Sequence, residues 1–168
     1  SACGAAFPWA TRRSAPDDDP RAQLENLLRR LPRVIRQLRS RNDNRPPFRV
    51  EDERDLEDLL RSLLPLHFDD VRPRSRTPRY APNTRTDFLL APERVAVTAK
   101  YVRPRVSERQ LAEQWSEDLA YWRGQRNCRL LVGFVHDPEG GLRDLRAHEA
   151  AWAIQEDAWG AQCVIGER

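Results

Sequence analysis

Two neighbouring stretches decide the fold: residues 85–90, with the sequence RTDFLL, and residues 95–100, with the sequence VAVTAK. Both are largely apolar and have the length of buried strands, and residues 91–94 (APER) form a short connection between them. We therefore expect a β-hairpin in the interior of an α/β domain. This hairpin would bring the carboxylate of Asp87 close to the ammonium group of Lys100.

Lys100 is the one lysine in the chain; all the other members of its 29 Lys and Arg residues are arginines. A guanidinium is a broad fork with permanent charge, whereas an ammonium is a compact donor that can hold a water molecule in place. One interpretation of Lys100 is therefore a catalytic lysine at the end of a buried strand. The other is structural, with its aliphatic stem lying along the sheet edge.

An acid on one strand and a lysine on the next resembles the PD-(D/E)XK nuclease superfamily, the restriction-endonuclease-like fold. The motif of that superfamily is an acid on one strand and acid-x-lysine on the following strand. Asp87 matches the first acid and Lys100 matches the lysine. Thr98 stands where the second acid belongs, so this position is degenerate. The resemblance implies nucleic acid as the partner, with DNA as the expected form, and Mg²⁺ (or Mn²⁺) as the cofactor of an active enzyme.

The missing acid matters because Mg²⁺ takes oxygen ligands, commonly carboxylates, and a neutral threonine hydroxyl does not offset its charge. In such sites the metal polarises the phosphoryl oxygen and generates hydroxide, while the lysine orients the attacking water. The resemblance offers two replacement acids, Glu113 on the helix after the hairpin and Glu53, with Glu57 one turn later, on the first core helix. Both have a simpler interpretation as solvated or dipole-compensating glutamates.

Arginines flank the expected site on both sides, although the formal net charge of the chain is only +3. Clustered cations near a substrate phosphate would give a local nucleic-acid-binding face that the net charge hides. The alternative is an ordinary solvated surface, since arginine is the general cation of this chain. The predicted nucleic-acid-binding residues are Arg74, Arg76, Arg79, Arg85, Arg103 and Arg105.

The order of expected elements matches the α-β-β-β-α-β core of the nuclease fold, a mixed central sheet flanked by helices. The expected helices cover residues 51–64, a segment opened by a capping box at Ser107 and Gln110, and residues 145–158. The domain plan is a flexible arm over residues 1–20 and a single nuclease-like domain over 21–168. Its parts are a basic N-terminal helix over 21–41, a core over about 50–136, and a C-terminal helix and strand over 145–165.

Three functional classes remain open at the level of sequence. The first is a metal-dependent endonuclease that uses a relocated acid. The second is a pseudoenzyme that binds nucleic acid without cutting it, or an assembly module in a larger bacterial defence protein. The third is a protein-binding domain that uses the basic helix. No run is long enough to span a membrane, and scattered cysteines suggest a reduced, cytoplasmic chain; a homodimer or fusion to other domains stays open.

Overall fold

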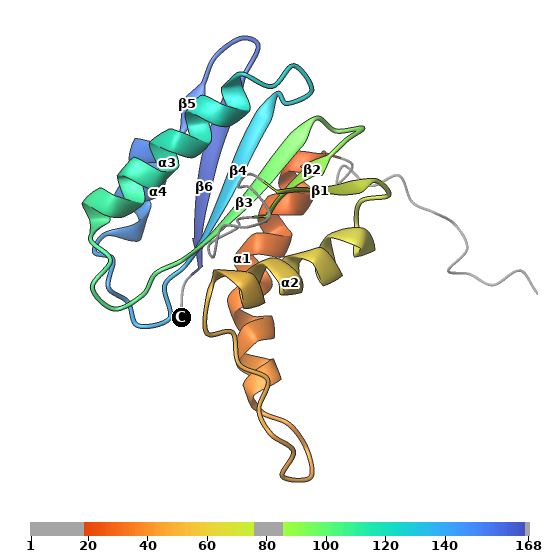
Figure 1. The fold of residues 1–168 in the computed structure, drawn as a ribbon, viewed down its shortest axis with the longest axis vertical. Helices are drawn as coiled ribbons and strands as arrows, with labels where there is room; N and C mark the ends of the chain where they lie inside the picture. Colours follow the sequence, from red (N-terminus) through yellow and green to blue (C-terminus); the bar gives the residue numbers. More distant parts are fainter. Residues whose placement is uncertain (1–18, 76–85, 167–168) are drawn as a thin grey trace, which may run out of the picture.

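The computed structural model describes residues 19–75 and 86–166, which form one mixed sheet with helices on both of its faces (Figure 1). The helices and strands, in chain order, are α1 (Pro20–Arg39), α2 (Glu53–Leu63), the 3₁₀ turn η1 (Leu64–Leu66), β1 (Val71–Ser75), β2 (Thr86–Leu90), β3 (Val95–Tyr101), α3 (Glu108–Arg123), β4 (Leu130–His136), α4 (Leu145–Trp152), β5 (Ile154–Gln155) and β6 (Gly160–Gly166).

The sheet has six strands in the order β1-β2-β3-β4-β6-β5. Strand β2 is antiparallel to both β1 and β3, so it forms the expected hairpin with β3. Strands β3, β4 and β6 are parallel, and β5 pairs with β6 only through Ile154 and Gln155. The run from α2 to β4 is therefore the α-β-β-β-α-β core that the sequence predicts.

Each face of the sheet has its own hydrophobic core. One core joins α1 and α2 to side chains such as Phe88 and Val97. The other joins α3 to side chains such as Leu89 and Ala96. Figure 1 shows α1 and α2 on one side of the sheet and α3 with α4 on the other. Successive side chains along a strand therefore enter different cores, because they point alternately to the two faces of the sheet.

Local signals explain where the main helices begin. Asp19 caps α1 by accepting a hydrogen bond from the backbone N–H of Arg21, and Asp52 caps α2 in the same way. The capping box of Ser107 and Gln110 opens α3 as predicted. Each cap satisfies backbone donors that a helix end leaves without a partner inside the helix.

The predicted helix over residues 145–158 is wrong in its second half. Helix α4 ends at Trp152, and the chain then forms β5, in which Ile154 pairs with Ala161 of β6. The stretch is rich in alanine and has good local helix propensity, but backbone pairing with an existing strand outweighs that weak preference. Of the predicted arm, residues 1–18 lie outside the described part, and the division into arm and domain stays a prediction.

Candidate nuclease-like site

The three residues that the sequence predicts for the nuclease motif share one face of the sheet. Thr98 and Lys100 alternate with Val97 and Ala99, which enter the core under α1 and α2, so they face α3 instead. Asp87 precedes Phe88, which also faces α1 and α2, and therefore lies on the α3 side too. The hairpin thus places the acid, the threonine and the lysine together beneath α3.

Lys100 is buried against an acid from α3. Its Nζ lies 2.5 Å from Oδ2 of Asp118, and the two side chains are only 2% and 0% exposed. An ion pair removed from water in this way replaces hydration with mutual attraction, and each charge depends on the other. The ammonium is therefore engaged inside the protein and does not face solvent.

Asp87 is engaged by the same helix. Its Oδ2 accepts a hydrogen bond of 2.9 Å from the indole N–H of Trp122, which lies one turn after Asp118 on α3. Asp87 and Trp122 are each 1% exposed. One face of α3 thus supplies a carboxylate to Lys100 and a donor to Asp87.

Thr98 does not supply the ligand that a second acid would provide. Its hydroxyl is buried and has no hydrogen-bond partner among the described residues. In residues 19–75 and 86–166 there is no group of three or more His, Cys, Asp or Glu side chains that could hold a metal ion. A hard divalent cation needs several oxygen ligands and an approach for its waters. The donor set around Asp87 and Lys100 does not fit such an ion.

The structure places the two proposed replacement acids away from this constellation. Glu113 is an exposed residue of α3 that pairs with Arg109 one turn earlier at 2.9 Å. Glu53 lies at the start of α2, whose apolar side packs on the opposite face of the sheet. Glu57 is buried, and its Oε1 accepts from the backbone N–H of Thr86 at 3.0 Å. That glutamate therefore fixes the start of β2.

Exposed arginines surround the edge of the sheet where β1 and β3 end and β2 begins. Arg74 closes β1, and Arg103 and Arg105 follow β3. Arg36 and Arg39 of α1 line a cavity of about 220 Å³ beside His136, at the end of β4. We call these five arginines the basic rim; none of them pairs with an acid in the described part of the chain. Arg76, Arg79 and Arg85 lie outside the described residues.

Burial is the main influence on the pKa values of two aromatic residues beside the rim. Burial of the His136 ring lowers the pKa of its imidazole below the usual value, and the nearby charge of Arg39 acts in the same direction. Burial raises the pKa of Tyr101, whose ring meets that of His136 edge-on at 5.6 Å. His136 is therefore held neutral near pH 7, and the arginines supply the positive charge at this edge.

Sequence reasoning missed Asp118 and the polar role of Trp122. A usable signal existed: Asp118 falls on the same helical stripe as Leu111, Trp115 and Trp122, and these three are buried. An acid inside an apolar stripe indicates a buried charge that needs a partner. The partner could not be chosen from sequence, because it depends on which part of the sheet α3 covers.

Comparison with known proteins identifies a family that matches the chain. The family model REase_DpnII-MboI, which describes a group of restriction endonucleases, matches residues 22–166. No curated protein and no solved structure is significantly similar to the chain. The matched range runs from the first turn of α1 to the end of β6. None of the helices in the described ranges has the length and apolar content that crossing a bilayer requires.

Proposed function

Because the chain belongs to the DpnII-MboI restriction endonuclease family, we propose that it is a DNA-directed nuclease-like domain that does not hydrolyse its target. The single observation behind this proposal is the closed ion pair of Lys100 with Asp118. In an active site the lysine must reach the attacking water, and here its ammonium is held by a buried carboxylate. The members of this family typically use a divalent metal, and the residues around Asp87 do not supply a set of ligands for one.

Opening the site would require α3 to leave the sheet. Leu111, Trp115 and Trp122 of that helix are buried in the core that covers Lys100. Burial of a large apolar side chain stabilises a fold by roughly 1.5–3 kcal/mol, so three of them oppose opening by several kcal/mol. That sum is comparable with the total stability of a small domain. The site formed by Asp87, Lys100 and Asp118 is therefore closed by the same packing that stabilises the fold, and we call it the closed site.

The basic rim supports DNA as the partner. Its arginines lie at the sheet edge that also carries the start of β2 and the end of β3, so DNA held there would lie over the closed site. Guanidinium groups that are not paired with acids are free to contact backbone phosphates. The domain would then bind duplex DNA through its rim and leave the phosphodiester intact.

Two other functions remain as alternatives. In the first, Asp118 is the relocated acid of an active endonuclease, an option favoured by its place on α3, the helix whose Trp122 donates to Asp87. In the second, the domain is an assembly module of a larger bacterial defence protein and the rim binds another protein.

A cleavage assay tests the loss of catalysis. Supercoiled plasmid is incubated with the wild-type chain at several protein concentrations, in the presence of excess Mg²⁺ or Mn²⁺. We expect no nicking by the wild type and no heat on calorimetric titration with Mn²⁺. Metal-dependent cleavage by the wild type that Asp87→Asn abolishes would contradict the proposal. Loss of that cleavage also in Asp118→Asn, in a variant that circular dichroism shows to be folded, would identify Asp118 as the relocated acid.

A binding assay tests the DNA partner independently. Anisotropy of a labelled duplex should rise on addition of the wild-type protein at low salt, and the affinity should fall steeply as salt increases. The double variant Arg103→Gln and Arg105→Gln should reduce the slope of log affinity against log salt by about 1 for each arginine. Arg30→Gln is the matched control, since Arg30 is an exposed α1 residue outside the rim. A wild-type chain that does not bind DNA at low salt would leave only the assembly module.

A further inference from the structure

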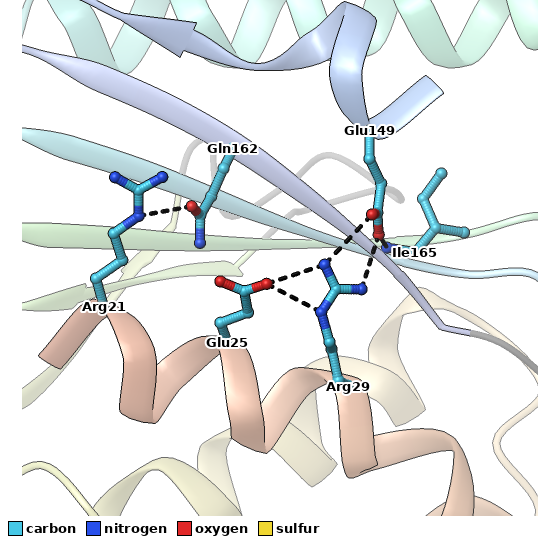
Figure 2. Close-up of polar contacts among 6 residues, drawn as sticks. All are labelled: Arg21, Glu25, Arg29, Glu149, Gln162 and Ile165. Carbon is cyan, nitrogen blue, oxygen red and sulfur yellow. Dashed lines mark hydrogen bonds and ion pairs between the residues drawn. The ribbon is translucent and has the colours of Figure 1, made fainter. Parts of the chain in front are cut away.

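A second polar site lies beside β6, in a pocket of about 710 Å³ bounded by α1, α4 and β6. Figure 2 shows its central side chains, with Arg21, Glu25 and Arg29 on α1, Glu149 on α4 and Gln162 on β6. Arg146 of α4 also lines the pocket. The pocket contains no residue of the closed site and none of the basic rim, so its role is a separate question.

The side-chain amide of Gln162 is buried at this pocket and has an NH₂ group without a partner among the described residues. Gln162 is 8% exposed, and its Oε1 accepts a hydrogen bond of 2.7 Å from Nε of Arg21. A guanidinium nitrogen is only a donor, so it fixes the amide with the oxygen toward Arg21 and the NH₂ group turned away. Figure 2 shows that NH₂ group pointing toward α1, above Glu25. Among the described residues, Gln162 Nε2 has no hydrogen-bond partner.

The acceptors in the pocket are mostly occupied. Arg29 donates to Glu25 and to both oxygens of Glu149, at 2.9, 3.2 and 3.3 Å. Glu149 Oε1 also accepts from the backbone N–H of Ile165 at 2.7 Å. The hydrogen bond to Glu149 is the main cause that raises the pKa of the Arg29 guanidinium. One oxygen of Glu25 is the acceptor that this network leaves over.

The N–H donors that line the pocket and have no acceptor outnumber the one remaining carboxylate oxygen. The terminal nitrogens of Arg21 and the whole guanidinium of Arg146 pair with no acid in the described part of the chain, and the Gln162 NH₂ group adds two more N–H donors. The lining carries three arginines and two glutamates, so its charge is positive. A buried donor without a partner costs about 1–3 kcal/mol, so a ligand that satisfies Gln162 gains affinity from it.

We infer that this pocket binds a phosphate monoester. Its phosphate oxygens would accept from Arg21, Arg146 and Gln162, because guanidinium forks match phosphate geometry. A hydroxyl or N–H group elsewhere on the ligand would donate to the remaining oxygen of Glu25. A mononucleotide and the 5′-phosphorylated end of a DNA strand share this chemistry, and the volume accommodates either.

The test uses calorimetry with the full chain. The wild type is titrated with a deoxynucleoside 5′-monophosphate, with the same deoxynucleoside lacking phosphate, and with inorganic phosphate. We expect binding of the monophosphate, weaker binding of inorganic phosphate, and none of the nucleoside. Equal binding of nucleoside and nucleotide, or binding of none of the three, would overturn the inference, since water alone would then satisfy Gln162.

Variants tie the binding to this pocket. Gln162→Glu keeps the size of the side chain but replaces the NH₂ donors with an acceptor, and Arg146→Gln removes an exposed cation that carries no structural pairing. Each should weaken monophosphate binding at least tenfold, while Arg30→Gln on α1, at an exposed residue that does not line the pocket, should leave it unchanged. An equal loss in Arg30→Gln would overturn the inference by showing a diffuse charge effect. Circular dichroism confirms that each variant is folded.

Two duplexes separate the sources of the phosphate. One carries 5′-phosphate ends and the other 5′-hydroxyl ends, and binding to the rim affects both equally. A preference for phosphorylated ends that Gln162→Glu abolishes assigns the pocket to DNA ends. Equal binding of the two duplexes, together with binding of the mononucleotide, assigns it to a free nucleotide. This readout does not depend on cleavage, so loss of the proposed non-hydrolytic role leaves it interpretable.

Discussion

The closed site under α3 and the pocket beside β6 contain similar side chains in opposite states. Under α3, Lys100 and Asp118 form a buried ion pair. Beside β6, Arg29 bridges two glutamates at the surface, with 46% of its own side chain exposed. The difference shows that the presence of charged residues does not define a binding site. What matters is whether their donors and acceptors are already used within the protein.

The two regions also differ in the free-energy cost of removing one partner of an ion pair. Charges without water depend entirely on each other, so removal of one partner leaves the other uncompensated. Charges at the surface exchange one partner for solvent with little loss. Substitutions in the first region should therefore affect stability, and substitutions in the second should affect ligand binding. Three predictions examine this division.

The largest effect is expected for Asp118→Asn. The variant keeps the shape of the side chain but leaves the Lys100 ammonium buried without a counter-charge, which costs about 3–5 kcal/mol in the free energy of unfolding. Urea denaturation followed by circular dichroism measures the change. The double variant Lys100→Met with Asp118→Leu should recover much of the loss. A change below about 1 kcal/mol in Asp118→Asn, as for an exposed pair, would mean that the pair is accessible to water.

An intermediate effect is expected for Trp122→Phe. Phenylalanine preserves most of the apolar packing but removes the indole N–H that donates to Asp87. The loss in the free energy of unfolding should therefore be about 1–3 kcal/mol. The same denaturation experiment measures it. Trp152→Phe serves as a control, because Trp152 is only half-buried on α4 and does not contact Asp87. Equal losses in the two variants would assign the effect to packing area and not to the hydrogen bond.

The smallest effect on stability is expected for Arg29→Gln. This change breaks contacts with both glutamates. Glu25 is 37% exposed and exchanges the arginine for solvent, and the less exposed Glu149 keeps its hydrogen bond from the Ile165 backbone, so the loss should be about 1 kcal/mol. Thermal unfolding at two salt concentrations provides the measurement, and the difference from the wild type should shrink at high salt. A loss as large as that of Asp118→Asn would remove the distinction between the two regions.

Much of the fold is readable from the chain. The apolar runs around Asp87 and Lys100 predict a hairpin, and the Ser107 capping box predicts the start of α3; both predictions are confirmed. The end of α4 was not predictable from local sequence, because Ile154 leaves the helix in order to pair with Ala161 of β6. Periodicity and capping act over a few residues, whereas strand pairing depends on neighbours that are distant in sequence.

The candidate site was less predictable than the fold. The sequence correctly predicted the strands that carry Asp87 and Lys100, whereas the replacement of an acid by Thr98 stays a prediction. It did not show that Asp118 would face Lys100, because the rotation of α3 about its own axis is fixed by packing of several large side chains. The assignment of Glu53 and Glu113 as metal ligands remains a prediction that their positions on α2 and on the exposed side of α3 do not support.

The contact of Glu149 with the backbone of Ile165 has a further consequence for solubility. Strand β5 pairs with β6 only at Gly160 and Ala161, so the rest of that strand forms a sheet border where another chain could add by backbone pairing. The Glu149 carboxylate accepts from one backbone N–H of this border, so that donor is not available to pair with the carbonyl oxygen of an added strand. The side chain that organises the pocket therefore also protects the domain against aggregation.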